Sequence, residues 1–264
     1  MMLNSIKSGV MNKWTNRNWQ IIVTNDTSYY NFPVSILEGF IRDTQGTLEK
    51  MLMWAAYDWI KRYAIDKRGN AKYSVQAMRE VQDLLGFRIP CDTDEYHFYK
   101  ACGQVYSRYK GARTGIIRKL YWELREKTFI EDSDKVTLLY FLGAKSILGR
   151  KDYCKTNDLL LFARMNGLDK PFRNEEELRE KSHVVISAHF TRRRKDTLKQ
   201  RLTEEFHIQV YSFRDRGFYI SSKLTMEQLV EAVESNRKSS RGSFKKRISE
   251  TRDKVLAKLA QKPP

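Results

Sequence analysis

The sequence lacks the features that mark membrane, secreted and disulfide-linked proteins. Only three of its 264 residues are cysteines, namely Cys91, Cys102 and Cys154. Because this number is odd and the three are widely spaced, a disulfide framework is not indicated, and the count suits a reducing compartment. No apolar run approaches the ~18 residues that a membrane-spanning helix requires. The N-terminal stretch has no continuous apolar region and no small-residue cleavage site, so it does not resemble a signal peptide. We expect a cytoplasmic protein without a membrane partner.

Motifs for nucleotide hydrolysis, nucleophilic catalysis and metal binding are also missing. The chain contains neither the phosphate-binding pattern G-x-x-x-x-G-K-[ST] nor the nucleophile pattern G-x-S-x-G. Cys91, His97 and Cys102 offer three zinc ligands without a fourth. Two acidic clusters, Asp92–Glu95 and Glu131–Asp134, are more typical of solvated linkers than of a nuclease metal site. We expect a protein that is not an enzyme and has no cofactor and no metal, with a nuclease as a remote alternative.

Basic residues are in excess and unevenly distributed. The chain has 49 lysines and arginines against 32 aspartates and glutamates, a net charge of +17, and a pI near 9.7. Residues 191–264 hold 19 of the basic and 9 of the acidic residues, a net charge of +10. With 41% hydrophobic and 12% aromatic residues, the composition is that of a folded protein. A folded protein with this charge is expected to bind a polyanion, and nucleic acid is favoured over an anionic membrane.

The first 130 residues are predicted to be mainly helical. A long apolar stripe predicts a first helix, and shorter stripes predict three more helices after it. Ser74 is expected to cap the second helix and Gly86 to end it, and Thr114 is expected to cap the fourth. A β-like run begins at Gln20. We expect residues 1–130 to form one domain, with a degenerate winged helix as an open alternative. The stripe of the long helix consists of Leu48, Met51, Leu52, Ala55, Trp59 and Tyr63.

The second half shows the element order of a winged helix-turn-helix. Its apolar pattern predicts a helix over about 136–149, then a short buried helix that Thr156 or Asn157 caps. A helical region in one or two pieces runs to about Phe206, and a β-hairpin follows it. We expect residues 134–224 to form this domain. The fold class is then mainly α with small β-hairpins: a helical N-terminal domain, a winged helix-turn-helix and a basic helical tail.

The last helix before the hairpin separates apolar from basic side chains. At about 100° per residue, one arc contains four apolar residues that we expect to face the core: Phe190, Leu198, Leu202 and Phe206. The opposite arc consists of Arg192, Arg193, Asp196, Lys199, Gln200 and Thr203. Because arginine, lysine and glutamine can contact base edges and phosphates, we predict that four of them enter a DNA groove: Arg192, Arg193, Lys199 and Gln200. The alternative is a solvated helix whose charges only keep the protein soluble.

Further predicted DNA contacts lie next to this helix. Lys155 and Asn157 come at the start of the short buried helix, whose positive end favours phosphate. The hairpin loop carries Arg214 and Arg216 just before Gly217, which can adopt the positive φ of a hairpin loop. We expect these two arginines to enter the neighbouring minor groove or to contact its phosphates.

The C-terminal residues 225–264 are predicted to form a basic helical extension that begins with Thr225 as a cap. Its first part contains six basic residues without an intervening acid, so we expect phosphate contacts there; a flexible extension with non-specific affinity is the alternative. These six residues are Arg237, Lys238, Arg241, Lys245, Lys246 and Arg247.

One segment resembles a known group of proteins. The sequence KSILGRKDYCKTNDLLLFARMNG, residues 145–167, with its cap at Thr156 or Asn157, is similar to the scaffold helices of winged-helix DNA-binding proteins. Preceded by a helical half of similar size, residues 134–224 resemble a lobe of the two-lobed replication initiators and regulators of plasmids and other mobile elements. The resemblance implies a replication initiator or a transcriptional regulator of a mobile element.

The expected partner is double-stranded DNA, because a groove helix and an adjacent arginine-tipped hairpin would contact neighbouring parts of one duplex. A homodimer is left open. Two other classes of function stay open as well. One is an RNA-binding module, which ranks below duplex DNA; the other is a structural or protein-interaction component of a phage or mobile element.

Overall fold

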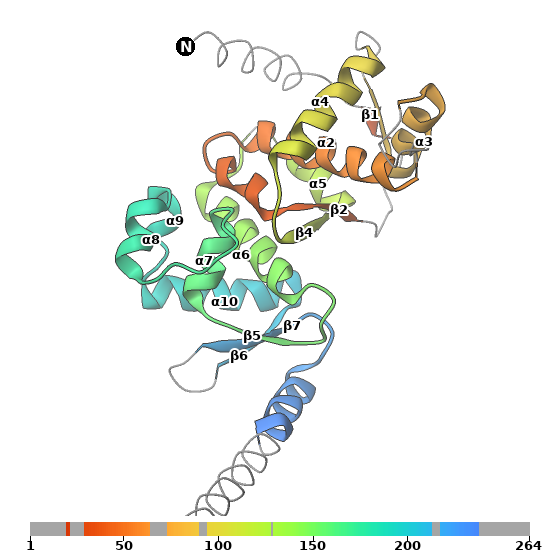
Figure 1. The fold of residues 1–264 in the computed structure, drawn as a ribbon. Coiled ribbons are helices and arrows are strands. Elements are labelled where there is room, and N and C mark those ends of the chain that lie inside the picture. The colour runs from red at the N-terminus through yellow and green to blue at the C-terminus, as the bar shows by residue number, and fades with distance from the viewer. Residues whose placement is uncertain are drawn as a thin grey trace, which may run out of the picture.

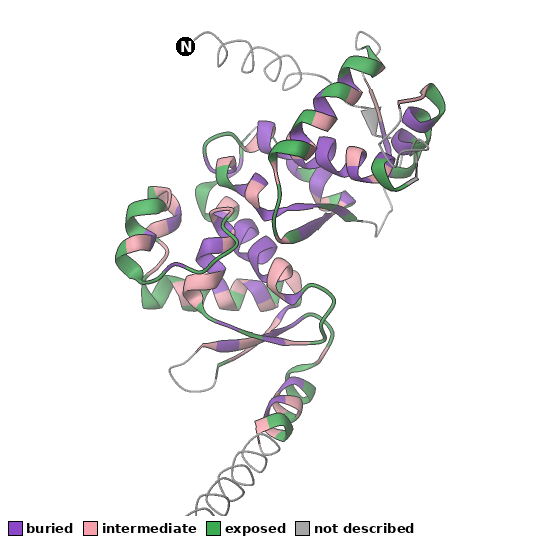
Figure 2. Ribbon diagram, in the orientation of Figure 1, coloured by how far each residue is buried: buried purple, intermediate pink, exposed green. Residues whose placement is uncertain are grey.

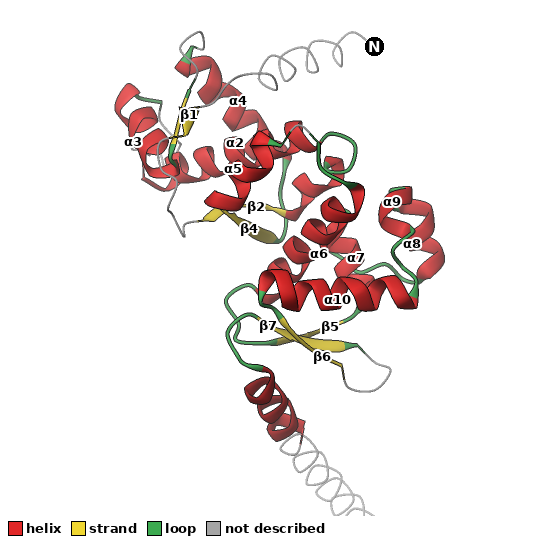
Figure 3. Ribbon diagram, turned by 180° about the vertical axis from the view of Figure 1, so that it is seen from behind, coloured by secondary structure: helices red, strands yellow, loops and turns green. Residues whose placement is uncertain are grey.

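The computed structural model describes residues 20–21, 29–63, 73–89, 94–127, 129–212 and 217–237 (Figure 1). This part of the chain is mainly helical and contains small antiparallel sheets, as the sequence predicted. The first half of the chain and the last, three-stranded sheet lie at opposite ends of the molecule, with helices between them (Figures 1 and 3).

The first half packs helices around two strand pairs. Strand β1 pairs with β3, and β2 pairs with β4 in a register that sets Tyr30 opposite Ile116. Both Tyr30 and Ile116 are fully buried, so one face of the second pair belongs to the core. The elements are β1 (Gln20–Ile21), β2 (Tyr29–Pro33), η1 (Val34–Gly39), α2 (Thr44–Tyr63), α3 (Val75–Leu85), β3 (Phe87–Arg88), α4 (Glu95–Arg108), β4 (Arg113–Ile117) and α5 (Arg118–Glu126).

The second half places helices against a three-stranded antiparallel sheet with the strand order β5-β7-β6. The strand β5, far ahead in sequence, pairs with the second strand of the terminal hairpin. The elements are α6 (Asp132–Leu148), β5 (Cys154–Thr156), α7 (Asp158–Met165), α8 (Glu175–Lys181), α9 (Val184–Ser187), α10 (Arg192–Phe206), β6 (Gln209–Ser212) and β7 (Phe218–Ser221). A further helix covers residues 226–237.

Local signals for helix ends are confirmed. Ser74, Asn157 and Thr225 each accept a hydrogen bond from the backbone N–H three residues further on, at 3.0, 2.8 and 3.3 Å. Gly86 follows α3 with φ of 72°, the left-handed conformation that glycine adopts without steric cost. These boundaries depend only on short-range bonding, and for that reason the sequence predicts them well.

Two expectations about elements are wrong. Thr114 does not cap a helix: it is buried in β4, and its hydroxyl donates to the Leu142 carbonyl at 2.6 Å. Pairing with β2 and this bond to α6 override the local capping signal. The region before Phe206 is divided into three helices rather than one or two, because extended backbone at Ser182 and Thr191 separates α8, α9 and α10.

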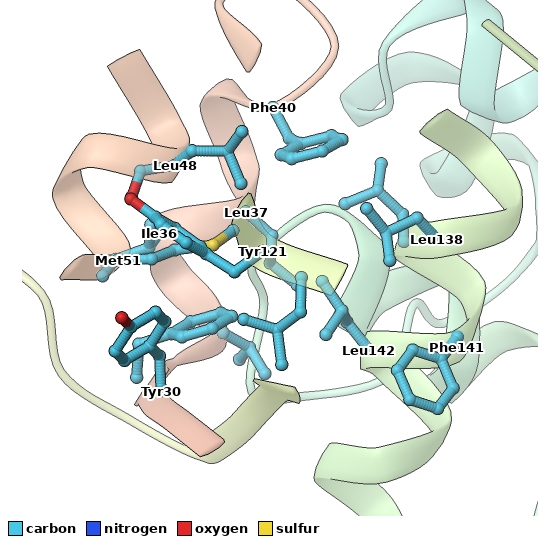
Figure 4. Close-up of a cluster of buried hydrophobic side chains, with 14 of the residues drawn as sticks. Tyr30, Ile36, Leu37, Phe40, Leu48, Met51, Tyr121, Leu138, Phe141 and Leu142 are labelled. Atoms are coloured by element: carbon cyan, nitrogen blue, oxygen red, sulfur yellow. The ribbon is translucent and has the colours of Figure 1, made fainter. Parts of the chain in front are cut away.

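Helix α6 is the common core element of both halves. Nine consecutive residues, from 136 to 144, are buried, so the helix has no solvent face there (Figure 2). Leu138 and Leu142 lie on the side of Leu37 and Phe40 of the first half (Figure 4). Phe141 lies on the other side, where its ring stacks on Phe206 of α10 at 4.2 Å between centroids.

Polar contacts also cross between the halves. Asp169, after α7, accepts a hydrogen bond from the Ala112 N–H at 2.8 Å, and Arg164 donates to the same oxygen at 2.8 Å. Gly167 has φ of 78°, and a Cβ there would lie 3.2 Å from the backbone of Ser35 in η1. The halves therefore contact each other through both apolar and polar groups. The division into a domain over 1–130 and one over 134–224 stays a prediction, and the core shared by the two halves leads us to expect that they unfold together.

Unfolding of a variant in the second half tests whether the two halves share α6 as part of one core. Leu202→Ala removes a fully buried side chain from α10, so we expect the free energy of unfolding to fall by about 2–5 kcal/mol. All five tryptophans lie within residues 14–122, so tryptophan fluorescence reports on the first half alone. Because the core is continuous, the urea midpoints from fluorescence and from circular dichroism at 222 nm should shift together. The control is Glu180→Ala, at an exposed position. A fluorescence midpoint that Leu202→Ala leaves unchanged would mean that the two halves unfold as independent domains.

Candidate nucleic-acid interface

Helix α10 buries its apolar side chains on one face and exposes polar side chains on another, as its periodicity predicts. Leu198 and Leu202 are buried, and Phe190 and Phe206 pack against the core at its two ends. The outer face of α10 borders an open hollow of about 510 Å³ and consists of Arg192, Arg193, Asp196, Thr197 and Gln200. The structure therefore brings three of the four predicted groove residues of this helix together on one exposed face.

The fourth predicted groove residue, Lys199, points elsewhere. Its ammonium lies 3.3 Å from Asp158 at the start of α7 and 4.4 Å from the centre of the Phe218 ring in β7. Lys195 approaches the same carboxylate at 3.1 Å. All three charged side chains are about 80% buried, with exposed fractions of 18% for Lys199, 20% for Lys195 and 21% for Asp158. Lys199 thus joins α10 to α7 and β7 instead of projecting with the arginines.

The first turn of α10 concentrates positive charge. Arg192, Arg193 and Arg194 are all exposed, and the turn contains no acidic residue. Arg194 donates to the Ala188 carbonyl at 2.8 Å, while no salt bridge to a described residue engages Arg192 or Arg193. The N-terminal end of a helix is itself positive, and cations there destabilise the helix slightly. This end of α10 is therefore suited to an anion.

Lys155 lies in β5, and Asn157 caps α7, whose first residue, Asp158, pairs with Lys195 and Lys199 of α10. Lys155 is exposed between two buried residues of β5. Asn157 is exposed; its side-chain oxygen accepts the hydrogen bond that caps α7, and its NH₂ group forms no hydrogen bond to a described residue. Gly217 has φ of 94°, as expected, and a Cβ there would lie 2.3 Å from the Thr156 carbonyl. The loop end of the hairpin therefore touches the backbone just before α7.

The outer face of the three-stranded sheet carries aromatic residues that the sequence analysis did not single out. In the strand register Lys155 lies opposite Tyr219, and Tyr219 lies opposite Tyr211. The Tyr153 ring is 6.3 Å from that of Tyr219. Ile208, Phe218 and Ile220 are buried on the other face of the sheet. Because side chains alternate between the two faces of a strand, this apolar pattern in the sequence predicts that Tyr211 and Tyr219 lie on the outer face.

Most predicted tail and loop contacts lie outside the described residues, namely Arg214, Arg216, Lys238, Arg241, Lys245, Lys246 and Arg247. Arg237 is described: it is the last described residue of the helix that begins at residue 226, and it forms a salt bridge with Glu234 at 2.9 Å.

Metal sites and membrane-spanning helices are absent from the described residues. No group of three or more histidine, cysteine, aspartate or glutamate side chains there has the arrangement of a metal site. Cys91 lies outside the described residues, and burial raises the pKa of the Cys102 thiol, which keeps it protonated. Of the helices in the described part, none has the length and apolarity to cross a bilayer.

No protein-family model, curated protein or solved structure matches this chain. The function is therefore inferred from the side chains and their arrangement.

The shared carboxylate provides a stability test. Asp158→Asn removes the partner of two largely buried ammonium groups, so we expect the free energy of unfolding to fall by roughly 1–3 kcal/mol. The matched control is Asp152→Asn, which breaks the exposed 2.7 Å pair with Lys223 and should cost less than about 1 kcal/mol. Urea denaturation of the two variants measures the difference. Equal midpoints would show that Asp158 does not hold α10 in place.

Proposed function

We propose that this chain binds double-stranded DNA through a winged helix-turn-helix formed by residues 134–224. The order α6, β5, α7, α10, β6, β7 and the strand order β5-β7-β6 support this proposal. In a winged helix, a short strand after the first helix joins the hairpin to make such a sheet. The chain departs from the simplest arrangement because α8 and α9 lie between α7 and α10, where a short turn is usual.

The observation that carries the proposal is the outer face of α10. Its 15 residues form a rod roughly 22 Å long and about 10–12 Å wide, which fits a major groove about 12 Å wide. Arg192 and Arg193 can form bidentate hydrogen bonds to guanine, and Gln200 can do so to adenine. Gln200 donates at present to Glu204 at 2.8 Å, an exposed bond that a base edge can replace.

The chemistry of this face favours nucleic acid over a protein partner. Protein interfaces depend on buried aromatic and aliphatic anchors. None of the exposed large apolar side chains in the described residues belongs to α10; the largest exposed fractions are those of Phe129 and Val184. The net charge of +17 adds long-range attraction to a polyanion. Lys155 and Asn157, beside the loop end of the hairpin, are suited to hold phosphates on the flank of the duplex.

The biological role that we propose is replication initiation or transcriptional control for a mobile element. It rests on the resemblance of the second half, preceded by a helical lobe, to two-lobed initiators and regulators. An RNA-binding module and a protein-interaction component are the outcomes that the binding experiment below distinguishes.

Arginine variants test the groove helix. Arg192→Ala and Arg193→Ala should each weaken binding to a duplex selected from a random pool by about 1–3 kcal/mol if the residue contacts a base. Both side chains are exposed, so urea midpoints should stay unchanged. The control is Arg179→Ala, which removes an exposed arginine of α8 that pairs with Glu175 at 2.6 Å.

Fluorescence anisotropy at constant salt measures these affinities, with structured RNA as a competitor. Equal binding by the two arginine variants and wild type would remove α10 from the interface. Preferential binding of RNA would support the RNA-binding class, and no affinity for either polyanion would support a protein-interaction component.

A C-terminal deletion tests the tail separately. Removal of residues 238–264 deletes basic residues that the sequence predicts to act by counterion release. Affinity should fall by a similar factor for selected and scrambled duplexes. The slope of log affinity against log salt should shrink by about one unit for each phosphate that the shortened chain no longer neutralises. A salt titration provides both values; loss of discrimination between the two duplexes would instead assign base reading to the tail.

A further inference from the structure

Six aromatic rings, from α2, from α4 and from the segment before α3, form a continuous series in the first half, away from α10. We call these six residues the aromatic ladder: Trp54, Tyr57, Tyr73, Tyr96, Tyr99 and Tyr106. Successive ring centroids, in the order 54–106–57–99–73–96, are 4.8, 5.1, 5.6, 5.4 and 5.1 Å apart. Spacings of this size are contact distances between aromatic rings.

The ladder runs along the edge of the hydrophobic core, with Trp54 buried at one end. The core side of α4 consists of Phe98, Cys102 and Val105, which are at most 4% exposed. The tyrosines of the ladder are only partly buried, and Tyr96 is 42% exposed. Their spacing on α4, at 96, 99 and 106, is helical and marks one stripe beside the core stripe. The tyrosine rings are therefore partly accessible from solvent.

Gly103 lets the two helices meet closely at the middle of the ladder. It occupies the same stripe of α4, and a Cβ at this position would lie 3.0 Å from the Tyr57 ring. A larger residue would push Tyr57 away from Tyr99 and Tyr106. The glycine thus keeps the ring series continuous.

Lysines lie over the ladder's rings. The Lys110 ammonium is 4.4 Å from the centre of the Tyr106 ring, and that of Lys61 is 5.2 Å from it. The Lys100 ammonium is 4.5 Å from the centre of the Tyr96 ring. All three lysines are exposed. Among the described residues, the acids of this region include Asp58, which pairs with Arg62 and Arg113, and Asp94 and Glu95 near the Tyr73 end.

We propose that the aromatic ladder binds single-stranded DNA. Unpaired bases can stack on aromatic rings, and ammonium groups among the rings can pair with the phosphates between the bases. Duplex DNA offers only base edges to a protein, so this surface selects unpaired strands. A stacking base would displace a lysine from its ring toward a neighbouring phosphate. The choice of DNA over RNA rests on the proposed function; the stacking itself does not.

Binding of a fluorescent oligothymidylate by the full-length chain tests the proposal. Tyr96→Ala and Tyr106→Ala should each lower affinity by about 5- to 150-fold, the range for removal of one stacked base. Tyr96→Phe and Tyr106→Phe keep the ring and should bind within about threefold of wild type. The matched control is Tyr29→Ala, because Tyr29 is 40% exposed and has Lys145 5.2 Å above its ring, yet lies outside the ladder.

Lysine variants keep the test valid if an alanine variant of a tyrosine unfolds. Lys100→Ala and Lys110→Ala should each reduce the slope of log affinity against log salt by about 0.7 units, because each removes one cation that neutralises a phosphate. Three results would overturn the proposal: folded alanine variants with wild-type affinity, an equal loss of affinity in Tyr29→Ala, or tighter binding of oligouridylate than of oligothymidylate.

The same variants separate this proposal from the one for α10. Arg192→Ala and Arg193→Ala should weaken duplex binding and leave oligothymidylate binding unchanged, and the ladder variants should do the reverse. If wild type binds no duplex while ladder variants still lose oligothymidylate affinity, the duplex proposal fails and the ladder proposal stands. If all variants weaken both ligands equally, the ladder is not a separate site.

Discussion

Helix α6 has to pack against both halves of the molecule at once. An ordinary amphipathic helix buries one stripe, but residues 136–144 of α6 are buried without interruption. Thr114, from β4, donates to the Leu142 carbonyl on one side, and the Phe141 ring meets Phe206 of α10 on another. Because both halves dock on the same helix, the orientation of α10 relative to the first half is fixed. The faces of the neighbouring helices that do not pack against α6 or the rest of the core stay exposed to solvent, and the outer face of α10 is one of them.

The cations of α10 have two different roles because of this packing. Lys195 and Lys199 lie over the start of α7, where the single carboxylate of Asp158 serves both. Without a counter-ion, two largely buried ammonium groups would be costly. Arg192 and Arg193, in the first turn of the helix, have no such partner in the described part of the chain. Charge on a helix therefore does not identify a binding residue until its partner across the helix interface is known.

This distinction also limits what the sequence can predict. The apolar arc of α10 and the positive φ of Gly217 are local properties, and both predictions are confirmed. The cap of α7 is local too: of the two candidates that the sequence offers, Thr156 and Asn157, the structure shows Asn157. The strand role of Thr114 depends on β2 and α6, and the ion pair of Lys199 depends on α7, so neither follows from periodicity. The aromatic ladder lies between these cases: the spacing of its tyrosines on α4 is visible in the sequence, but the meeting of Tyr57 with Tyr99 across 42 residues is not.

The two proposed surfaces differ in the chemistry that they present. The outer face of α10 carries planar guanidinium groups, which match base edges and phosphates through paired hydrogen bonds. The ladder carries flat rings with lysines, whose compact charge can follow a flexible strand without fixed geometry. Helix α10 lies on one side of α6, and α2 and α4, which carry five of the six ladder residues, lie on the other (Figures 1 and 3). A chain with both sites would hold paired DNA at α10 and unpaired DNA at the ladder, and the shared core would set the distance between the two. That distance is fixed only as long as α6 remains packed against both halves.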